Sequence, residues 1–408
     1  MKIYSTAEWI TILTNANMGQ DILKDVRCAI ERSGFPLEHY VGTILIKHGW
    51  QIITNRNYID DIKGIEREID ILAYKVYTDT KENIEYITAL IISCKKSDKH
   101  KWCFLTREID EDDCNINWTP FHYCTSDERL KAMTESHLDN IIDRYKAHRA
   151  VKHLYSFDNM VFAYQQLVEP ANEKERTKIG NLCAVKNEDI YNSISTTIKA
   201  ISSEKEGRLS AYSYIKHQRY YTFHALSIFE GDMYNAHFNS EGKVEVKEIT
   251  NTKYLNRHIV GGIDDFYLVH FNKKNIFEFR LRLFDYLHEE NCRTLPKMIN
   301  KFYREIYTDP NKLKLVWGTA EDNIKTQIKY ILHSLGYLST EFISITPILK
   351  NGILTIEVWG ISTSDKQVFE LLNSNEVLLD ITKKSLSDFL RYNGEFKFVE
   401  PDLFDTLD

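Results

Sequence analysis

The 408-residue chain contains only seven prolines and no uninterrupted run of eighteen apolar residues. The scarcity of proline argues against long proline-rich linkers, and the missing apolar run argues against a transmembrane helix. Residues 1–21 do not have the pattern of a secretory signal, because Thr, Asn and Glu interrupt their apolar residues. We therefore expect a cytoplasmic protein without a membrane partner.

Paired cysteine motifs and an excess of positive charge are also lacking. The seven cysteines are odd in number and never form CxxC, which is typical of free thiols in a reducing compartment. There are 52 Lys and Arg against 59 Asp and Glu, a net charge of −7. A global positive field is thereby excluded, so nucleic acid would have to be bound by a local basic patch.

Three common enzyme motifs are absent: the P-loop GxxxxGK[ST], the zinc-binding HExxH and the esterase GxSxG. ATPase, zincin and α/β-hydrolase functions therefore lose their usual support.

The composition, with 43% hydrophobic and 27% charged residues, is ordinary for a folded protein. The length predicts more than one domain. We expect an N-terminal helical segment (1–34), a larger domain (35–270) and a smaller C-terminal α+β domain (271–408).

The strongest pattern of secondary structure lies between residues 36 and 95. Apolar residues spaced by three and four predict a helix over 36–48, and the period then changes to that of strands over 50–60, 67–77 and 84–94. These strands should form an antiparallel set. Further along the chain we expect an irregular stretch, a capped helix, a strand hairpin, and a helix interrupted near Pro296, over 100–135, 186–202, 220–250 and 276–306. The last hundred residues predict two helices and a strand pair.

One constellation of residues carries chemistry. Glu38 lies in the first turn of the predicted helix, Asp70 on the second strand and Lys95 at the end of the third. Carboxylates are the hard oxygen ligands that Mg²⁺ prefers, and such an ion polarises a phosphate and lowers the pKa of an attacking water. A nearby lysine can orient that water or neutralise the charge of the transition state. These residue types suit metal-dependent cleavage of phosphodiester bonds.

A helical Glu (PLEHYVGTILIKHGW), a strand Asp (GIEREIDILAYK) and an apolar strand ending in SCKKS together resemble the PD-(D/E)XK restriction-endonuclease-like superfamily. The resemblance covers roughly residues 36–105 and implies an α/β core, a mixed central sheet flanked by helices. It implies that Glu38 and Asp70 bind Mg²⁺ or Mn²⁺ and that Lys95 is the catalytic lysine. The segment LIISCKKSDKHKWCF is also similar to a stretch in defence-associated members, which implies a role in bacterial restriction or anti-phage defence.

The chain departs from this pattern at Ser93, where the superfamily has Asp or Glu. A hydroxyl is a weaker, neutral metal ligand. Glu68, two residues before Asp70 on the same strand face, could replace the missing carboxylate, with the Cys94 carbonyl as a further ligand. Alternatively the site is degenerate, and the fold binds nucleic acid or scaffolds a defence complex without cutting. A third possibility is a site completed only by a partner.

Each residue also has a purely structural interpretation. Glu38 could be a solvated carboxylate favoured by the helix dipole, and Glu68 a plain surface charge. Lys95 and Lys96 could be solubilising charges at a strand end. Asp70 follows an isoleucine on a core strand, where an unpaired carboxylate is costly, so its structural alternative is an ion pair with Lys95.

Candidate nucleic-acid contacts follow the third strand directly: Lys96, Lys99, Lys101 and Trp102. Lysines can contact phosphates and a tryptophan can stack on a base; the alternative is an ordinary exposed turn. Gln165 and Gln166 lie where some superfamily members place a helical polar residue. The sequence therefore predicts an Mg²⁺-dependent endonuclease that acts on DNA more readily than RNA. The C-terminal domain is expected to bind the target, a protein partner or a second copy of the chain.

Overall fold

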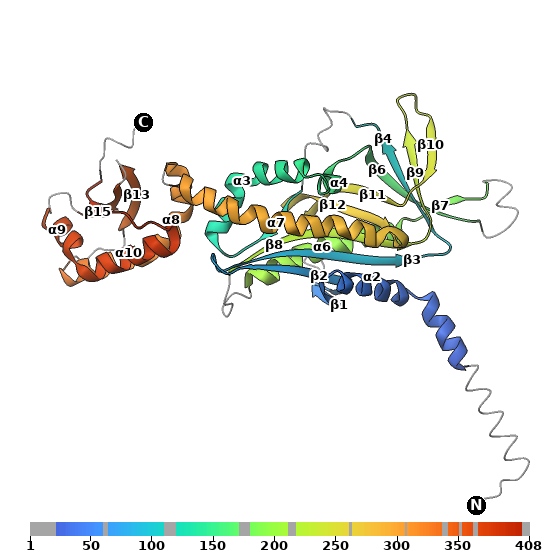
Figure 1. Ribbon diagram of the computed structural model, residues 1–408, viewed down its shortest axis with the longest axis horizontal. Helices are drawn as coiled ribbons and strands as arrows, with labels where there is room; N and C mark the ends of the chain where they lie inside the picture. The colour runs from blue at the N-terminus through green and yellow to red at the C-terminus, as the bar shows by residue number, and fades with distance from the viewer. Residues whose placement is uncertain are drawn as a thin grey trace, which may run out of the picture.

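The computed structural model describes residues 22–59, 64–109, 120–170, 180–210, 218–260, 263–306, 308–336, 342–350, 353–361 and 366–401. Within these ranges, mixed β-sheets are flanked by helices (Figure 1), which confirms the predicted general class. No described helix is long and apolar enough to span a membrane. Of the predicted N-terminal helical segment, residues 22–32 are helical, and residues 1–21 lie outside the described ranges.

The largest sheet has the strand order β1-β2-β3-β8-β12-β11, with β5 also paired to β8. Its strands are β1 (Gln51–Ile59), β2 (Glu66–Asp79), β3 (Ile84–Lys96), β5 (His122–Cys124), β8 (Gln218–Glu230), β11 (Asn251–Val260) and β12 (Ile263–Lys273). The predicted antiparallel set β1-β2-β3 is confirmed. Strand β8 runs parallel to β3, and β12 runs parallel to β8. The carboxyl ends of these three strands therefore meet at one edge of the sheet.

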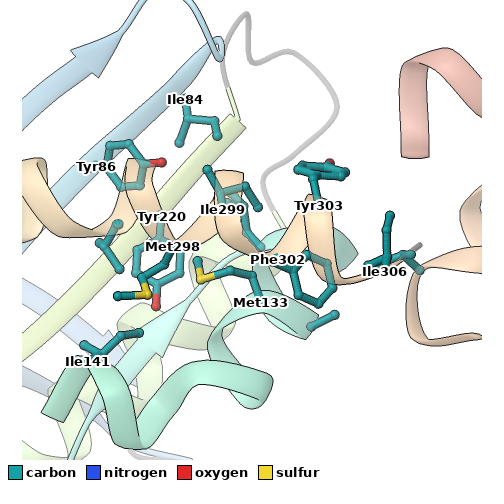
Figure 2. Close-up of a cluster of buried hydrophobic side chains, with 14 of the residues drawn as sticks. Ile84, Tyr86, Met133, Ile141, Tyr220, Met298, Ile299, Phe302, Tyr303 and Ile306 are labelled. Atoms are coloured by element: carbon teal, nitrogen blue, oxygen red, sulfur yellow. The ribbon is translucent and has the colours of Figure 1, made fainter. Parts of the chain in front are cut away.

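Helices cover both faces of this sheet because its central strand is apolar on both sides. On β3, Leu90 and Ile92 pack into one core cluster, and Ala89 and Ile91 pack into another. The first cluster includes residues of α2 (Phe35–Lys47), α3 (Glu128–Ala147), α4 (Lys152–Tyr155) and α7 (Phe277–Glu305). The second includes the apolar face of α6 (Glu188–Ser210). Figure 2 shows Met298 and Phe302 of α7 beside Met133 of α3 and Tyr220 of β8.

A second sheet has the order β10-β9-β4-β6-β7. Its strands are β4 (Lys101–Arg107), β6 (Met160–Val168), β7 (Cys183–Val185), β9 (Met233–Phe238) and β10 (Val244–Glu248). The expectation that 100–135 is irregular is wrong for the described part of that range, because β4, β5 and the start of α3 fall within it. Residues 110–119 lie outside the described ranges. The expected hairpin over 220–250 is correct only for β9 and β10. Strand β8 does not pair with β9, because the chain turns at Gly231 and enters the other sheet.

Helix α7 is continuous, so the predicted interruption at Pro296 is wrong. Loss of one backbone donor is tolerated because residues on both sides, such as Leu287 and Phe302, stay buried in the same core. Helix α7 packs on β2, β3 and β12. The packing of the first sheet thus continues beyond the domain boundary predicted at residues 270 and 271, and the division into domains stays a prediction.

The remaining elements form the C-terminal part of the chain, which lies at one end of the molecule (Figure 1). They are α8 (Pro310–Ser334), β13 (Ser344–Lys350), β14 (Ile353–Trp359), α9 (Lys366–Ser374), α10 (Glu376–Leu390) and β15 (Phe396–Val399). The short helix η2 (Lys274–Ile276) belongs with the first sheet instead, because it joins β12 to α7. Strands β13 and β14 pair antiparallel, as the sequence predicts. Helix α8 packs against α10 and β13 and also against α3.

Candidate functional site

Helix α2 carries Glu38 to the edge of the sheet where β2 begins and the antiparallel β3 ends. Pro36 lies in the first turn, where its missing N–H costs nothing, and Leu37 and Val41 are fully buried. Burial raises the pKa of the half-buried Glu38 carboxyl, and the negative charge of Asp70 raises it further, while Lys95 lowers it. Three side chains that are far apart in the sequence therefore interact at one place.

The Asp70 carboxylate is held by β3. Its Oδ2 accepts a hydrogen bond from the Cys94 backbone N–H at 2.5 Å and one from the Ser93 hydroxyl at 3.3 Å. The Lys95 Nζ lies 3.8 Å from the same oxygen. The ion pair offered as the structural alternative is thus present, at a distance that leaves the ammonium able to contact a further group. The side chains of Asp70 and Lys95 are 20% and 33% exposed, so both can be reached from solvent.

The backbone opposite Asp70 is irregular. The register pairs Thr54 with Ile71 and Arg56 with Ile69, which places Asn55 across from Asp70. Asn55 has a φ of 52°, in the left-handed region that asparagine tolerates better than most residues. Ile69 and Ile71, which alternation predicts on one face, accordingly pack into different core clusters. Backbone of this kind is often found beside functional groups.

Ser93 and Cys94 take different roles. Ser93 is almost fully buried and presents only its neutral hydroxyl to Asp70. The Cys94 side chain packs with Ile92 in the core, as expected, and burial raises the pKa of its thiol well above the usual value. Glu68 is exposed, and its charge makes the weakest of the contributions to the raised pKa of Glu38. Its role as a replacement carboxylate stays a prediction.

The donors at this edge fit Mg²⁺ better than a metal that requires a closed protein cage. Among the described residues, no three His, Cys, Asp or Glu side chains are grouped closely enough to hold a metal ion. Mg²⁺ commonly binds through one or two carboxylates, keeps several waters and contacts substrate phosphates. Glu38 and Asp70 supply such a pair, and their mutual repulsion is the kind that a divalent cation relieves.

The prediction that Trp102 stacks on a base is wrong. Its side chain is fully buried, and its ring lies parallel to that of Phe229 with centroids 3.9 Å apart. The residue faces the core because β4 is an inner strand of the second sheet. Lys101 is paired with Asp232 at 2.6 Å.

Of the other predicted contacts, Lys99 is exposed. Lys96 donates from its Nζ to the backbone carbonyl of Glu31 at 2.7 Å, which ties the end of β3 to the helix before α2. The role of Lys96 and Lys99 as phosphate contacts stays a prediction.

Gln165 and Gln166 lie on β6, so they are not helical as the resemblance implied. Gln165 Nε2 donates to the Val185 carbonyl at 2.6 Å. The amide of Gln166 donates to Asp189 Oδ2 at 2.8 Å and accepts from the Asp189 N–H at 3.0 Å. These contacts fix the first turn of α6, which is a structural role.

Two further lysines, Lys273 and Lys274, lie at the same edge of the sheet. Lys273 on β12 and Lys95 on β3 both align with Phe229 of β8, the strand that lies between them. A hollow of about 400 Å³ lies at the carboxyl ends of β8 and β12. It is lined by Tyr40, Phe229, Glu230, Gly231, Lys273, Lys274 and Asn275. The Lys274 Nζ lies 5.1 Å from the centroid of the Tyr40 ring and 2.9 Å from Glu230. The alignment of Lys95 with Lys273 depends on the parallel order of β3, β8 and β12, which no local sequence pattern predicts.

Comparison of the chain with protein-family models, curated proteins and solved structures finds no match.

Proposed function

We propose that the chain is a metal-dependent nuclease of the PD-(D/E)XK type, acting on DNA more readily than RNA. The observation that carries the proposal is the convergence of Glu38, Asp70 and Lys95, from α2, β2 and β3, at one solvent-accessible sheet edge. Two carboxylates and one ammonium in this arrangement have the charges that phosphodiester hydrolysis requires.

The roles of the residues follow from their positions. Glu38 and Asp70 would hold Mg²⁺, which when bound polarises the phosphate and lowers the pKa of a water molecule. Hydrogen bonds from the Cys94 N–H and the Ser93 hydroxyl fix the Asp70 carboxylate. The Lys95 ammonium donates to the phosphate oxygens on which negative charge develops. Water attacks phosphorus, and the bond to the leaving oxygen breaks.

The substrate backbone would lie along the carboxyl ends of β3, β8 and β12. Lys96, Lys99, Lys273 and Lys274 lie at or just beyond these strand ends, and Tyr40 lines the adjoining hollow. Lys273 and Lys274 are paired with Glu248 and Glu230 at 2.8 and 2.9 Å, so phosphate groups would have to replace these carboxylates. Binding through this local group of lysines is compatible with a net charge of −7 for the whole chain. It replaces the phosphate and base contacts first expected of Lys101 and Trp102.

The test is nicking of supercoiled plasmid DNA with Mg²⁺ or Mn²⁺. Wild type should cleave, and Asp70→Asn and Lys95→Ala should not. Lys243→Ala, which changes an exposed ion pair with Glu241, is the control and should match wild type. Circular dichroism establishes that each variant is folded. Equal rates for wild type and both site variants, on DNA and on RNA, would contradict the proposal.

A second candidate function is nucleic-acid binding or scaffolding without cleavage. It is favoured by Ser93 in place of an acid and by the lack of a third close protein ligand among the described residues. DNA binding that survives Asp70→Asn, with no cleavage by wild type and no metal site, would support it over catalysis. A role in restriction or anti-phage defence, with a partner or second copy bound by the C-terminal part, rests on the resemblance alone. Cleavage that appears only on co-expression with such a partner would support it.

A further inference from the structure

A second concave site lies between α7, β11 and the β9–β10 hairpin. It is a cavity of about 410 Å³, and neither Glu38, Asp70 nor Lys95 lines it. The charged side chains on its wall are His153, Asp158, Lys247, Lys253 and Arg280. The volume is within the range of sites for small molecules, and positive groups outnumber the single carboxylate.

Lys253 of β11 has no acidic partner in this wall. Its Nζ donates to the backbone carbonyls of Ser156 and, at 3.2 Å, His153, and it lies 4.9 Å from the centroid of the Phe157 ring. No carboxylate of the described residues lies within 4 Å of it. Burial and the charge of Arg280 lower the pKa of Lys253 to about 8, although Asp158 opposes the shift.

Among the described residues, Arg280 of α7 also has no carboxylate partner. Its Nε donates to Asn272 Oδ1 at 3.2 Å, and within the described part of the chain its other guanidinium N–H groups have no acceptor. Burial lowers the pKa of Arg280. Burial and the charges of Arg280 and Lys253 also lower the pKa of the neighbouring His270. The Nδ1 of His270 is buried and has no hydrogen-bond partner among the described residues. The electrostatic environment of this cavity is therefore positive.

We propose that the cavity binds a small phosphate-bearing anion of nucleotide size, a function separate from phosphodiester cleavage. Half-buried cations without counter-ions are costly, and a bound anion removes that cost. The planar guanidinium of Arg280 matches two phosphate oxygens, and Lys253 adds a point charge. Asn235 and Asn251 bring amide groups to the wall, and Phe279, 67% exposed, offers a ring face. A duplex is too large for 410 Å³, which favours a small molecule.

The binding test is calorimetry with ATP, in the presence of EDTA so that the candidate metal site does not contribute. Wild type should bind ATP, and Arg280→Gln and Lys253→Gln should each weaken binding by about tenfold or more. Lys243→Gln is the matched control and should bind as wild type does. Pyrophosphate binding with the same dependence on Arg280 would also support the proposal.

Equal affinity for ATP in wild type, Arg280→Gln and Lys253→Gln would overturn the proposal, and so would the absence of heat with both ATP and pyrophosphate at millimolar concentration. A single-stranded oligonucleotide that binds through Arg280, while ATP and pyrophosphate do not, would overturn it in favour of a nucleic-acid contact. Thermal unfolding of each variant separates lost binding from lost folding.

A second readout isolates Lys253. Charged or titratable groups facing it come from several elements: His153 and Asp158 near α4, Lys247 on β10, His270 on β12 and Arg280 on α7. Between pH 7 and 9.5, deprotonation of Lys253 should weaken ATP binding by about tenfold. Lys253→Arg keeps its charge and should hold its affinity over that range. A wild-type affinity that does not change with pH, or an equal fall in Lys253→Arg, would contradict the role of Lys253.

Discussion

The candidate nuclease site has more negative than positive side chains, whereas the cavity beside α7 has more positive than negative ones. At the sheet edge, one ammonium, Lys95, faces Glu38, Asp70 and the more exposed Glu68. In the cavity, Lys253 and Arg280 are bonded to neutral carbonyl and amide oxygens. The first arrangement is completed by a cation and the second by an anion. A net charge of −7 for the whole chain therefore does not determine which ligand each site binds.

Asp70→Asn should produce the largest effect. It removes one of two metal-binding carboxylates, so we expect the nicking rate to fall by about a hundredfold to a thousandfold. ATP affinity at the cavity should be unchanged, since Asp70 does not line it. The reciprocal variant, Arg280→Gln, should lose ATP binding and nick DNA at the wild-type rate. If either folded variant lost both nicking and ATP binding, the two sites would not be independent.

Ser93→Asp should restore the missing acid. The Ser93 Oγ lies 3.3 Å from Asp70 Oδ2, so a carboxylate there repels Asp70 until a cation binds. We expect Mn²⁺ to bind about tenfold more tightly, worth about 1.4 kcal/mol of extra stabilisation at saturating metal. Thermal unfolding with and without Mn²⁺ measures this. Ser93→Asn, equal in size but neutral, is the control, and an equal gain in both variants would argue against a metal site.

Removing the strand-end lysines should weaken DNA binding moderately. Lys273→Gln combined with Lys274→Gln should lower affinity and reduce the slope of log K against log salt by about two phosphate contacts, near 0.9 each. Titrations of a labelled duplex at several salt concentrations give both quantities. Lys243→Gln, on an exposed turn, serves as the control. An unchanged slope in the double variant would show that DNA does not follow this edge.

The smallest expected effect is the change in metal-free stability caused by Glu38→Gln. Because the folded pKa of Glu38 is raised, the native state holds its proton more tightly than the unfolded state does. Ionisation of Glu38 therefore costs stability as pH rises above about 4.5. Without metal, the variant should be more stable than wild type by roughly 0.5 kcal/mol at pH 7, after allowance for solvent screening, and equal at low pH. Urea unfolding at pH 7 and pH 4 tests this, and a less stable variant at pH 7 would contradict it.

Local patterns predicted the core of the site. The change from helical to alternating spacing located α2, β2 and β3, and strand ends brought Asp70 and Lys95 together. Trp102 was misplaced because a basic run resembles a surface turn, whereas β4 is an inner strand covered by Phe229. Burial of this kind depends on a neighbouring sheet and cannot be inferred from nearby residues.

Long-range topology supplied the rest. Lys95 and Lys273 are 178 positions apart in the sequence, and only the order β3-β8-β12 aligns them. The cavity likewise combines Lys253 of β11, Arg280 of α7 and Lys247 of β10. Lys95 lies in the SCKKS motif, but Lys247, Lys253, Lys273 and Arg280 lie in no motif, so sequence reasoning could not single them out.

A calorimetric titration with Mn²⁺ tests most directly whether Glu38 and Asp70 form a divalent-metal site, because it needs no knowledge of the substrate. We expect one binding site in wild type that is lost in Asp70→Asn and retained in Arg280→Gln. A wild-type protein without a Mn²⁺ site, or a site of equal affinity in Asp70→Asn, would contradict it.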